Sequence, residues 1–207
     1  MTLYVPAHFR VEEKAELVDF MRHNAFATLI SAGDAGLHAS HVPLLVDVHG
    51  SKVVLRGHVA RANTQWEALE GAKNVVAIFH GPHAYVSPTW YVTQPSVPTW
   101  NYAAVHAAGK ARLTDEAELH EIISELSAKY EAGNNPPWRL SEQPAAYVSS
   151  MLAAIVGFEI EVERLDGKFK LSQNRPVEIP RVVERLEASG EKALAQLMRE
   201  HAPAPKG

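Results

Sequence analysis

Residues 155–173 read Ile-Val-Gly-Phe-Glu-Ile-Glu-Val-Glu-Arg-Leu-Asp-Gly-Lys-Phe-Lys-Leu-Ser-Gln, with the clearest alternation in the sequence. From 158 to 163 each apolar residue is followed by a glutamate. Because successive side chains of a strand point to opposite faces, this pattern predicts a strand with one face in water. Asp166-Gly167 is typical of a two-residue hairpin turn, so we expect a second strand over 168–173 with its apolar residues facing the core.

Three more strands are predicted in succession nearer the N-terminus, over 26–31, 37–48 and 52–59. Each is rich in apolar and β-branched residues, and residues typical of turns separate them at 33–36 and 49–51. Strands joined by such short connections form an antiparallel meander.

Further strands and several helices complete the predicted organisation. Apolar residues predict strands over 74–79 and 99–113, and the segment between them, 81–98, reads as a strand fragment followed by a proline-interrupted aromatic loop. Helical periodicity and capping residues predict helices over 11–23, from Asn63 to Leu69, from the cap Asp115 to Tyr130, and in a C-terminal extension over about 177–201.

No repeat, linker or shift in composition divides residues 1–207, so we expect a single domain. Its class is mainly β with helices (α+β). Roughly six or more antiparallel strands would form a small closed or half-closed barrel with peripheral and C-terminal helices.

The composition excludes several classes of function. The 207 residues contain 20 Lys and Arg against 24 Asp and Glu, which gives a formal charge of −4, and they contain no cysteine. Disulfides, cysteine zinc sites and thiol catalysis are therefore excluded. The acidic balance does not support non-specific DNA binding, which depends on clustered cations. No segment reads as a membrane span or a signal peptide, so we expect a cytoplasmic protein.

Common catalytic and metal-binding motifs are absent. The sequence has no G-x-S-x-G, P-loop, G-x-G-x-x-G or H-E-x-x-H pattern, and it assigns no catalytic residue. The pairs His38/His41 and His80/His83 have a spacing of three residues, which on a strand or a turn directs the imidazoles to different sides. We therefore predict no metal site.

Two segments are richer in polar and aromatic residues than a core strand requires. Gly57–Asn63 ends a predicted strand and leads through Arg61 to a helix-capping asparagine, an arrangement that can hold an anion. A capped helix with a solvated arginine is the alternative. Residues 85–102 bring Tyr and Trp together with Ser, Thr and Asn, which suits a planar heteroaromatic ligand. Filling of the core or of a dimer interface explains these aromatics equally well.

At these segments the sequence resembles the PaiB family of FMN-binding negative transcriptional regulators, whose split-barrel fold is related to pyridoxamine-phosphate oxidase. The resemblance is nearly full-length. The blocks that carry it are Tyr-Val-Pro-Ala-His-Phe at 4–9, Ala-Ser-His-Val-Pro-Leu-Leu at 39–45, Gly-His-Val-Ala-Arg-Ala-Asn at 57–63, Gly-Pro-His-Ala-Tyr-Val-Ser-Pro at 81–88, Val-Pro-Thr-Trp-Asn-Tyr-Ala-Ala-Val-His at 97–106, Ile-Val-Gly-Phe-Glu-Ile at 155–160 and Lys-Leu-Ser-Gln-Asn-Arg at 170–175.

The resemblance implies a homodimer that binds FMN in a groove between two barrels, with contacts from both subunits. Arg61 is the first expected contact to the flavin phosphate. The other implied cofactor-binding residues are Ser40, His41, His58 and Asn63 around the phosphate and ribityl chain, Thr99, Trp100 and Asn101 at the ring, and Lys170, Ser172 and Gln173 reaching across from the second subunit.

Some positions depart from the related families. Pyridoxamine-phosphate oxidases carry an Arg-x-Val-Leu-Leu-Lys strand, whereas residues 41–47 here read His-Val-Pro-Leu-Leu-Val-Asp. We therefore do not expect oxidation of a pyridoxal-type substrate. Thr64 and Gln94 replace a Pro and a Lys that are common in PaiB-like sequences, and neither change should abolish cofactor binding.

The function that the resemblance implies is an FMN-binding regulator that acts through the flavin or a small ligand. Direct operator binding is not supported, because the sequence shows no helix-turn-helix and no basic arm. The first alternative is an FMN-dependent oxidoreductase of reductase or oxidase type, in which the flavin carries the electrons. A third interpretation is haem or another planar ligand in the same groove.

Overall fold

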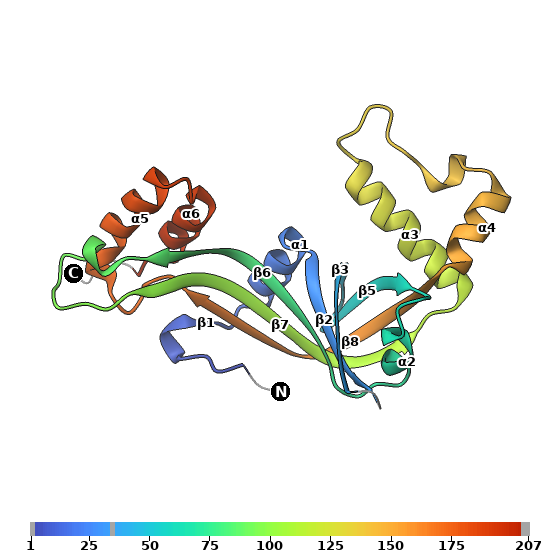
Figure 1. Cartoon of the computed structure of the whole chain (residues 1–207), viewed down its shortest axis with the longest axis horizontal. Coiled ribbons are helices and arrows are strands. Elements are labelled where there is room, and N and C mark those ends of the chain that lie inside the picture. The colour runs from blue at the N-terminus through green and yellow to red at the C-terminus, as the bar shows by residue number, and fades with distance from the viewer. Residues whose placement is uncertain (1–2, 34–35, 204–207) are drawn as a thin grey trace. The chain divides into compact units, whose positions relative to one another are not determined.

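The computed structural model describes residues 3–33 and 36–203 (Figure 1). The strands are β1 Arg10–Val11, β2 Phe26–Gly33, β3 Gly36–Pro43, β4 Leu45–His49, β5 Lys52–Ala60, β6 Val75–Val86, β7 Thr99–Leu113 and β8 Ile155–Lys170. The α-helices are α1 Lys14–His23, α2 Gln65–Leu69, α3 Glu116–Glu131, α4 Ala145–Ala153, α5 Ile179–Ala188 and α6 Lys192–Glu200. Short 3-10 helices lie at Ala7–Phe9, Pro88–Trp90, Leu140–Glu142 and Pro176–Glu178.

The strands belong to one sheet with the order β3-β2-β6-β7-β8-β5-β4, and β1 pairs with β8. The pairs β2–β3, β2–β6, β4–β5, β5–β8 and β1–β8 are antiparallel. The predicted antiparallel α+β class is therefore confirmed.

The chain divides into two compact units, each built from separated segments. Within the described residues, unit 1 contains 3–20, 80–106 and 166–203, and unit 2 contains 21–79 and 107–165. The single domain over 1–207 stays a prediction.

In unit 2 the predicted strand over 37–48 is divided at Leu44, which corrects the sequence-based boundary. The Leu44 N–H donates to the carbonyl of Ala25 over 2.9 Å, in register with the last β2–β3 pair, Phe26 and Pro43, and from Leu45 onward the chain pairs with β5 as β4. Gly57 of β5 lies against this break, because a Cβ at Gly57 would be 2.7 Å from Leu44 Cδ2 and 3.3 Å from the carbonyl oxygen of Pro43. Glycine at 57 permits this close approach of backbone and side chains.

The predicted helix after Asp115 is confirmed as α3. The Asp115 carboxylate accepts a hydrogen bond from the Glu118 N–H, and the Glu118 side chain accepts from the Asp115 N–H, which is a complete capping box. Leu119, Ile122 and Leu126 form the buried face of α3. Helix α4, which also belongs to unit 2, packs against α3.

In unit 1 the predicted hairpin turn at Asp166-Gly167 is wrong, since both residues lie inside the continuous strand β8. Gly167 is the register partner of Val11 in β1. A Cβ at Gly167 would lie 2.3 Å from Leu17 Cδ2 and 3.1 Å from the carbonyl oxygen of Val11. The glycine therefore provides room for α1 and β1 to approach β8. The helix that was predicted over 11–23 begins three residues later, at Lys14, because Arg10 and Val11 pair with β8.

One face of the unit 1 sheet is buried under helices. Phe169 of β8 contacts Phe20 of α1, with ring centroids 4.9 Å apart, and His201 at the end of α6, at 5.1 Å. His201 Nε2 lies 2.5 Å from a Glu16 carboxylate oxygen. Helices α5 and α6, which form the predicted C-terminal extension, pack against each other (Figure 1). Lys168 and Lys170 alternate with Phe169 along β8 and therefore point to the other face of the sheet.

The predicted turn at 33–36 includes residues 34 and 35, which lie outside the described residues. The glycines on either side of it, Gly33 and Gly36, are register partners. Across the described ranges, no helix is both long enough and apolar enough to cross a membrane.

Candidate functional site

The predicted pair Ser40 and Asn63 meets in unit 2. Asn63 Nδ2 donates to Ser40 Oγ over 2.8 Å, and Asn63 Oδ1 accepts from the Gln65 N–H over 3.1 Å. The amide of Asn63 therefore links β3 to the start of α2, and the helix begins two residues later than predicted. Both hydrogen bonds fix the orientation of a side chain that the sequence analysis assigned to the cofactor.

Helix α2 is held on β2 by a buried glutamine that the sequence analysis did not single out. Gln65 is fully buried, and its Nε2 donates to the carbonyl of Leu29 over 3.1 Å and to Ser31 Oγ over 3.2 Å. These bonds hold the position of the Ser40–Asn63 pair, because Ser40 is the register partner of Leu29.

His41 does not join this pair. It follows Ser40 on β3, so its side chain points to the opposite face of the strand. The imidazole is exposed and stacks on Phe26, with ring centroids 6.3 Å apart. The predicted contact of His41 with the cofactor stays a prediction.

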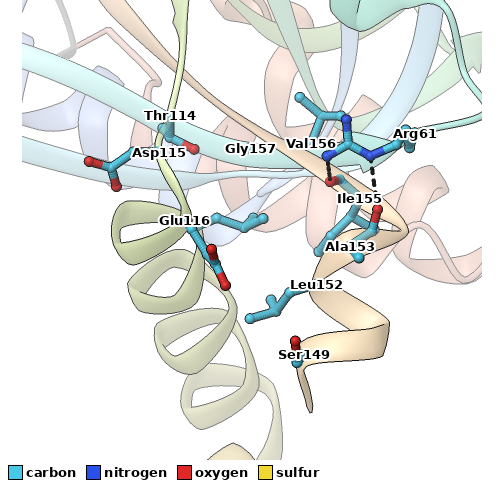
Figure 2. A pocket seen from close by; sticks show the side chains of 11 residues that line it. Arg61, Thr114, Asp115, Glu116, Ser149, Leu152, Ala153, Ile155, Val156 and Gly157 are labelled. Atoms are coloured by element: carbon cyan, nitrogen blue, oxygen red, sulfur yellow. Dashed lines mark hydrogen bonds between the residues drawn. The ribbon is translucent and has the colours of Figure 1, made fainter. Parts of the chain in front are cut away.

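Arg61 fastens the end of α4 to the end of β5. Its Nε donates to the carbonyl of Ala153 over 2.8 Å, and Nη2 donates to the carbonyl of Ile155 over 3.1 Å (Figure 2). The backbone N–H of Arg61 donates to the carbonyl of Ala154 over 2.8 Å. A cation is favourable beside the last carbonyls of a helix. Arg61 thus has a structural role, and its contact with a phosphate stays a prediction.

The side chain of Arg61 also lines a hollow of about 370 Å³ beside the start of α3 (Figure 2). Thr114 Oγ1, in the wall of this hollow, is buried and has no hydrogen-bond partner in the described part of the chain. Asp115 is occupied in capping α3, and its carboxylate points away from Arg61 (Figure 2). The other lining residues are Glu116, Leu119, Ser149, Leu152, Ala153, Ile155, Val156 and Gly157.

His58 lies on the same face of the sheet as this hollow. It is the register partner of Gly157, and a Cβ at Gly157 would be 2.2 Å from Thr114 Oγ1. Partner residues on neighbouring strands point to the same face. Among the described residues His58 Nδ1 is buried without a hydrogen-bond partner, and burial lowers the pKa of the imidazole, which favours the neutral ring.

Unsatisfied buried polar atoms are rare in proteins, and among the described residues unit 2 has three of them, Gln65 Oε1 and, on this face, His58 Nδ1 and Thr114 Oγ1. A polar ligand would supply the missing partners. The residues present therefore fit a cofactor with a phosphate and a polyhydroxyl chain. Thr114 was not among the predicted site residues, because a threonine before a helix cap is indistinguishable in sequence from an ordinary helix start.

In unit 1, three predicted site residues are occupied by hydrogen bonds within the unit. Asn101 and Ser172 are buried, and Asn101 Nδ2 donates to Ser172 Oγ over 2.9 Å. Gln173 accepts from the Leu171 N–H over 2.8 Å and donates to the carbonyl of Phe169 over 2.7 Å. The Asn101–Ser172 bond joins the start of β7 to the chain after β8, whereas the bonds of Gln173 are local to the end of β8. Direct contact of these residues with the flavin stays a prediction.

The other three predicted residues of unit 1, Thr99, Trp100 and Lys170, meet at the ammonium group of Lys170. Lys170 Nζ donates to the carbonyl of Trp100 over 2.7 Å and to Thr99 Oγ1. Burial lowers the pKa of Lys170, and the neighbouring charge of Lys168 lowers it further. Trp100 is 55% exposed and is therefore available to a ligand.

A family comparison identifies the chain. Residues 3–164 match the family model described as "Putative FMN-binding domain". The chain belongs to this FMN-binding family. Within the family it is 36% identical over 202 residues to the protease synthase and sporulation protein PAI 2 of Bacillus subtilis, covering 96% of this chain and 97% of that protein. An uncharacterized protein of Emericella nidulans is 34% identical, covering 83% of this chain and 84% of that protein. The resemblance to the PaiB family and its FMN cofactor is confirmed at the level of the family.

Solved structures support the fold assigned to this FMN-binding family. The flavocytochrome Anf3 of Azotobacter vinelandii superposes with a TM-score of 0.60 at 13% identity, covering 80% of this chain and 72% of that one. The FAD and heme binding protein of Mycobacterium smegmatis gives a TM-score of 0.58 at 15% identity, covering 78% and 73%. At such low identity these likenesses concern the fold alone, and the predicted split-barrel class is confirmed.

Proposed function

We propose that the chain binds FMN through His58, Arg61 and the Ser40–Asn63 pair of unit 2, and that it does so as a homodimer. Membership of the FMN-binding family supports the cofactor. The observation that carries the residue assignment is the buried, unpartnered Nδ1 of His58. A ligand that hydrogen-bonds to this nitrogen would remove the cost of leaving it unsatisfied.

Each of these side chains has a distinct task toward the cofactor. Arg61 supplies the cation for the phosphate, and Thr114 and His58 supply a hydroxyl and an imidazole for polar atoms of the ribityl phosphate. Asn63 and Ser40 hold the start of α2 in place. When bound, FMN supplies redox chemistry that no side chain of the protein can provide.

The test of this proposal is a titration of FMN into the purified protein, followed by flavin fluorescence and by the absorption spectrum. His58→Phe keeps an aromatic ring but removes the unsatisfied nitrogen. We expect it to weaken FMN binding about 10-fold while unfolding stability stays equal or rises, because the unpaired polar atom is gone. His120→Phe, at an exposed position of α3, is the control. Unchanged FMN affinity in His58→Phe would remove His58 from the site, and a Soret band in place of flavin bands would favour haem.

We propose a regulatory role for this chain. The Bacillus subtilis relative is named for protease synthesis and sporulation, and we propose that this chain likewise affects gene expression, from a cytoplasmic location. Because the formal charge of the protein is −4, the proposed effect on gene expression depends on the flavin or a small ligand and not on direct DNA binding. A gel shift with tight, salt-sensitive binding of the purified protein to a promoter would overturn this route.

The alternative function is an FMN-dependent oxidoreductase. A second hollow, in unit 1, favours it, because an oxidoreductase needs a place for its second reactant. This hollow measures about 400 Å³ and is lined in part by Trp100 and Tyr102. Anaerobic mixing of the FMN-loaded protein with NADH or NADPH tests it: bleaching of the flavin bands at turnover-competent rates supports catalysis, and no bleaching across a panel of donors counts against it.

A further inference from the structure

Two lysines of unit 1 differ from the other strand cations. On the strands of unit 2, Lys52 lies 2.8 Å from Glu161, and Arg56 lies 2.7 Å from Asp47. Lys110 and Arg112 also form ion pairs, with Glu163 and with Glu118 and Glu159. Lys168 and Lys170 of β8 have no carboxylate partner among the described residues.

The contacts of these two lysines are all with neutral groups. Lys170 Nζ donates to the carbonyl of Trp100 and to Thr99 Oγ1. Lys168 Nζ lies over two aromatic rings, 5.3 Å from the centroid of Tyr4 and 5.6 Å from that of Tyr102. The two ammonium groups are on the same side of β8 and repel each other, so an anion between them would be bound favourably.

An aromatic hollow lies next to this cationic pair. Trp100 contacts Tyr85 and His83, with ring centroids 6.1 Å and 6.4 Å away. Trp100 and Tyr102 line the hollow of about 400 Å³, and Tyr102 is also the ring beneath Lys168. The remaining lining residues are Leu3, His80, Gly81, His83, Ala103, Ala104 and His106, so none of the lining residues is acidic.

We propose that this hollow and the Lys168–Lys170 pair form a second binding site, for a small planar aromatic ligand that carries a phosphate, such as a mononucleotide. The ring stacks on Trp100 beside Tyr102, and the phosphate lies between the two ammonium groups. A volume of about 400 Å³ is in the range of small-molecule sites. Binding of this ligand does not require FMN. The inference rests on the proposed function only where it makes the ligand a substrate or effector of the flavin protein.

Calorimetry with adenosine 5′-monophosphate as the probe tests this site, in FMN-free and in FMN-loaded protein. We expect binding of the nucleotide in both forms, and weaker binding of adenosine or inorganic phosphate alone. Lys168→Ala and Lys170→Ala should each weaken nucleotide binding about 10-fold, the scale of one charge-assisted contact. Lys110→Ala removes an equal charge from a strand lysine that is paired with Glu163, and it should change nothing.

Three results would overturn the inference. The first is no heat of binding for the nucleotide at millimolar concentration, and the second is equal affinity in the Lys168→Ala/Lys170→Ala double variant. The third is displacement of the nucleotide by FMN in a one-to-one ratio, which would make the hollow part of the cofactor site. The two proposals are separated if His58→Phe no longer binds FMN but still binds the nucleotide. In that case the substitution affects the proposed FMN contacts and leaves the second site unchanged.

Discussion

The guanidinium of Arg61 donates a hydrogen bond of 2.8 Å to the carbonyl oxygen of Ala153, which follows it by 92 residues in the sequence. A second hydrogen bond, to the carbonyl oxygen of Ile155, makes the contact of the guanidinium bidentate. The residue proposed to bind the flavin phosphate therefore also closes the junction between α4 and β8, so cofactor binding and the position of α4 are expected to depend on the same side chain.

Replacement of Arg61 tests this double role. Arg61→Ala should weaken FMN binding by about 1.5 to 3 kcal/mol, the scale of a hydrogen bond to a charged group. Arg61→Lys should restore part of the FMN affinity but not the bidentate contact with Ala153 and Ile155, because an ammonium group lacks the planar set of donors of a guanidinium. Fluorescence titration gives the affinities, and urea unfolding gives the stabilities. Arg181→Ala, on the exposed side of α5, is the control. Equal FMN affinity in Arg61→Ala would show that Arg61 is structural alone.

The bond between Asn63 and Ser40 predicts unequal effects of two substitutions. Asn63→Ala removes both the bond to Ser40 and the bond that Asn63 Oδ1 accepts from the Gln65 N–H, so it should lower the free energy of unfolding by about 1 to 2 kcal/mol. Ser40→Ala removes one bond and should cost about 1 kcal/mol or less. A double-mutant cycle measures the coupling between the two residues. Strictly additive effects would contradict the direct contact, and Asn174→Ala, at an exposed position, serves as control.

Glu178 should make the stability of unit 1 depend on pH. Its buried carboxylate accepts from the N–H groups of Val92, over 2.6 Å, and Thr93, over 3.0 Å. Burial by itself would raise the pKa of Glu178, but these hydrogen bonds and the charge of Arg175 outweigh it and hold the pKa below its usual value. A lowered folded-state pKa means that the stabilisation is complete above the unfolded pKa and disappears as the pH falls through the folded one.

Glu178→Gln should therefore lower the free energy of unfolding by about 1.5 to 3 kcal/mol at pH 7, because one acceptor oxygen becomes an amide donor facing an N–H group. The difference from the wild type should shrink as the pH falls below about 4. Unfolding curves at several pH values measure it, with the exposed Glu184→Gln as the matched control. A difference that grows on acidification would contradict the assigned sign.

Gly167→Ala tests the correction of the hairpin. The added methyl would lie 2.3 Å from Leu17 Cδ2, so it should lower the free energy of unfolding by about 1 to 3 kcal/mol, as overpacking does. Gly133→Ala adds the same methyl where no atom lies within 4 Å, so a much smaller change is expected. Thermal or urea unfolding compares the two. An equal, small effect at both positions would mean that β8 does not pass close to α1 at this residue.

Much of the fold was predictable because its signals are local. Alternation predicted most of β8, β-branched runs predicted β2 and β5, and the cap Asp115 predicted the start of α3. The strand break at Leu44 and the continuous strand at Gly167 were not predictable, since each depends on residues distant in the sequence. Leu44 packs against Gly57 of β5, and Gly167 is small because Leu17 lies against it.

The candidate site divides in the same way. Sequence similarity assigned the family, the cofactor and the candidate residues without any coordinates. It could not tell which of those residues already have partners, because Asn101 is satisfied by Ser172, 71 residues away, while His58 Nδ1 has no partner among the residues that the structure describes. Nor did it reveal that Lys168 and Lys170 have no carboxylate partner within the described ranges, although the chain as a whole is acidic. The sequence by itself determined which side chains are available and how they alternate, since periodicity is a property of the local backbone. Only the tertiary structure decided which of them are satisfied, because hydrogen bonds and ion pairs join groups that the chain brings together from distant positions.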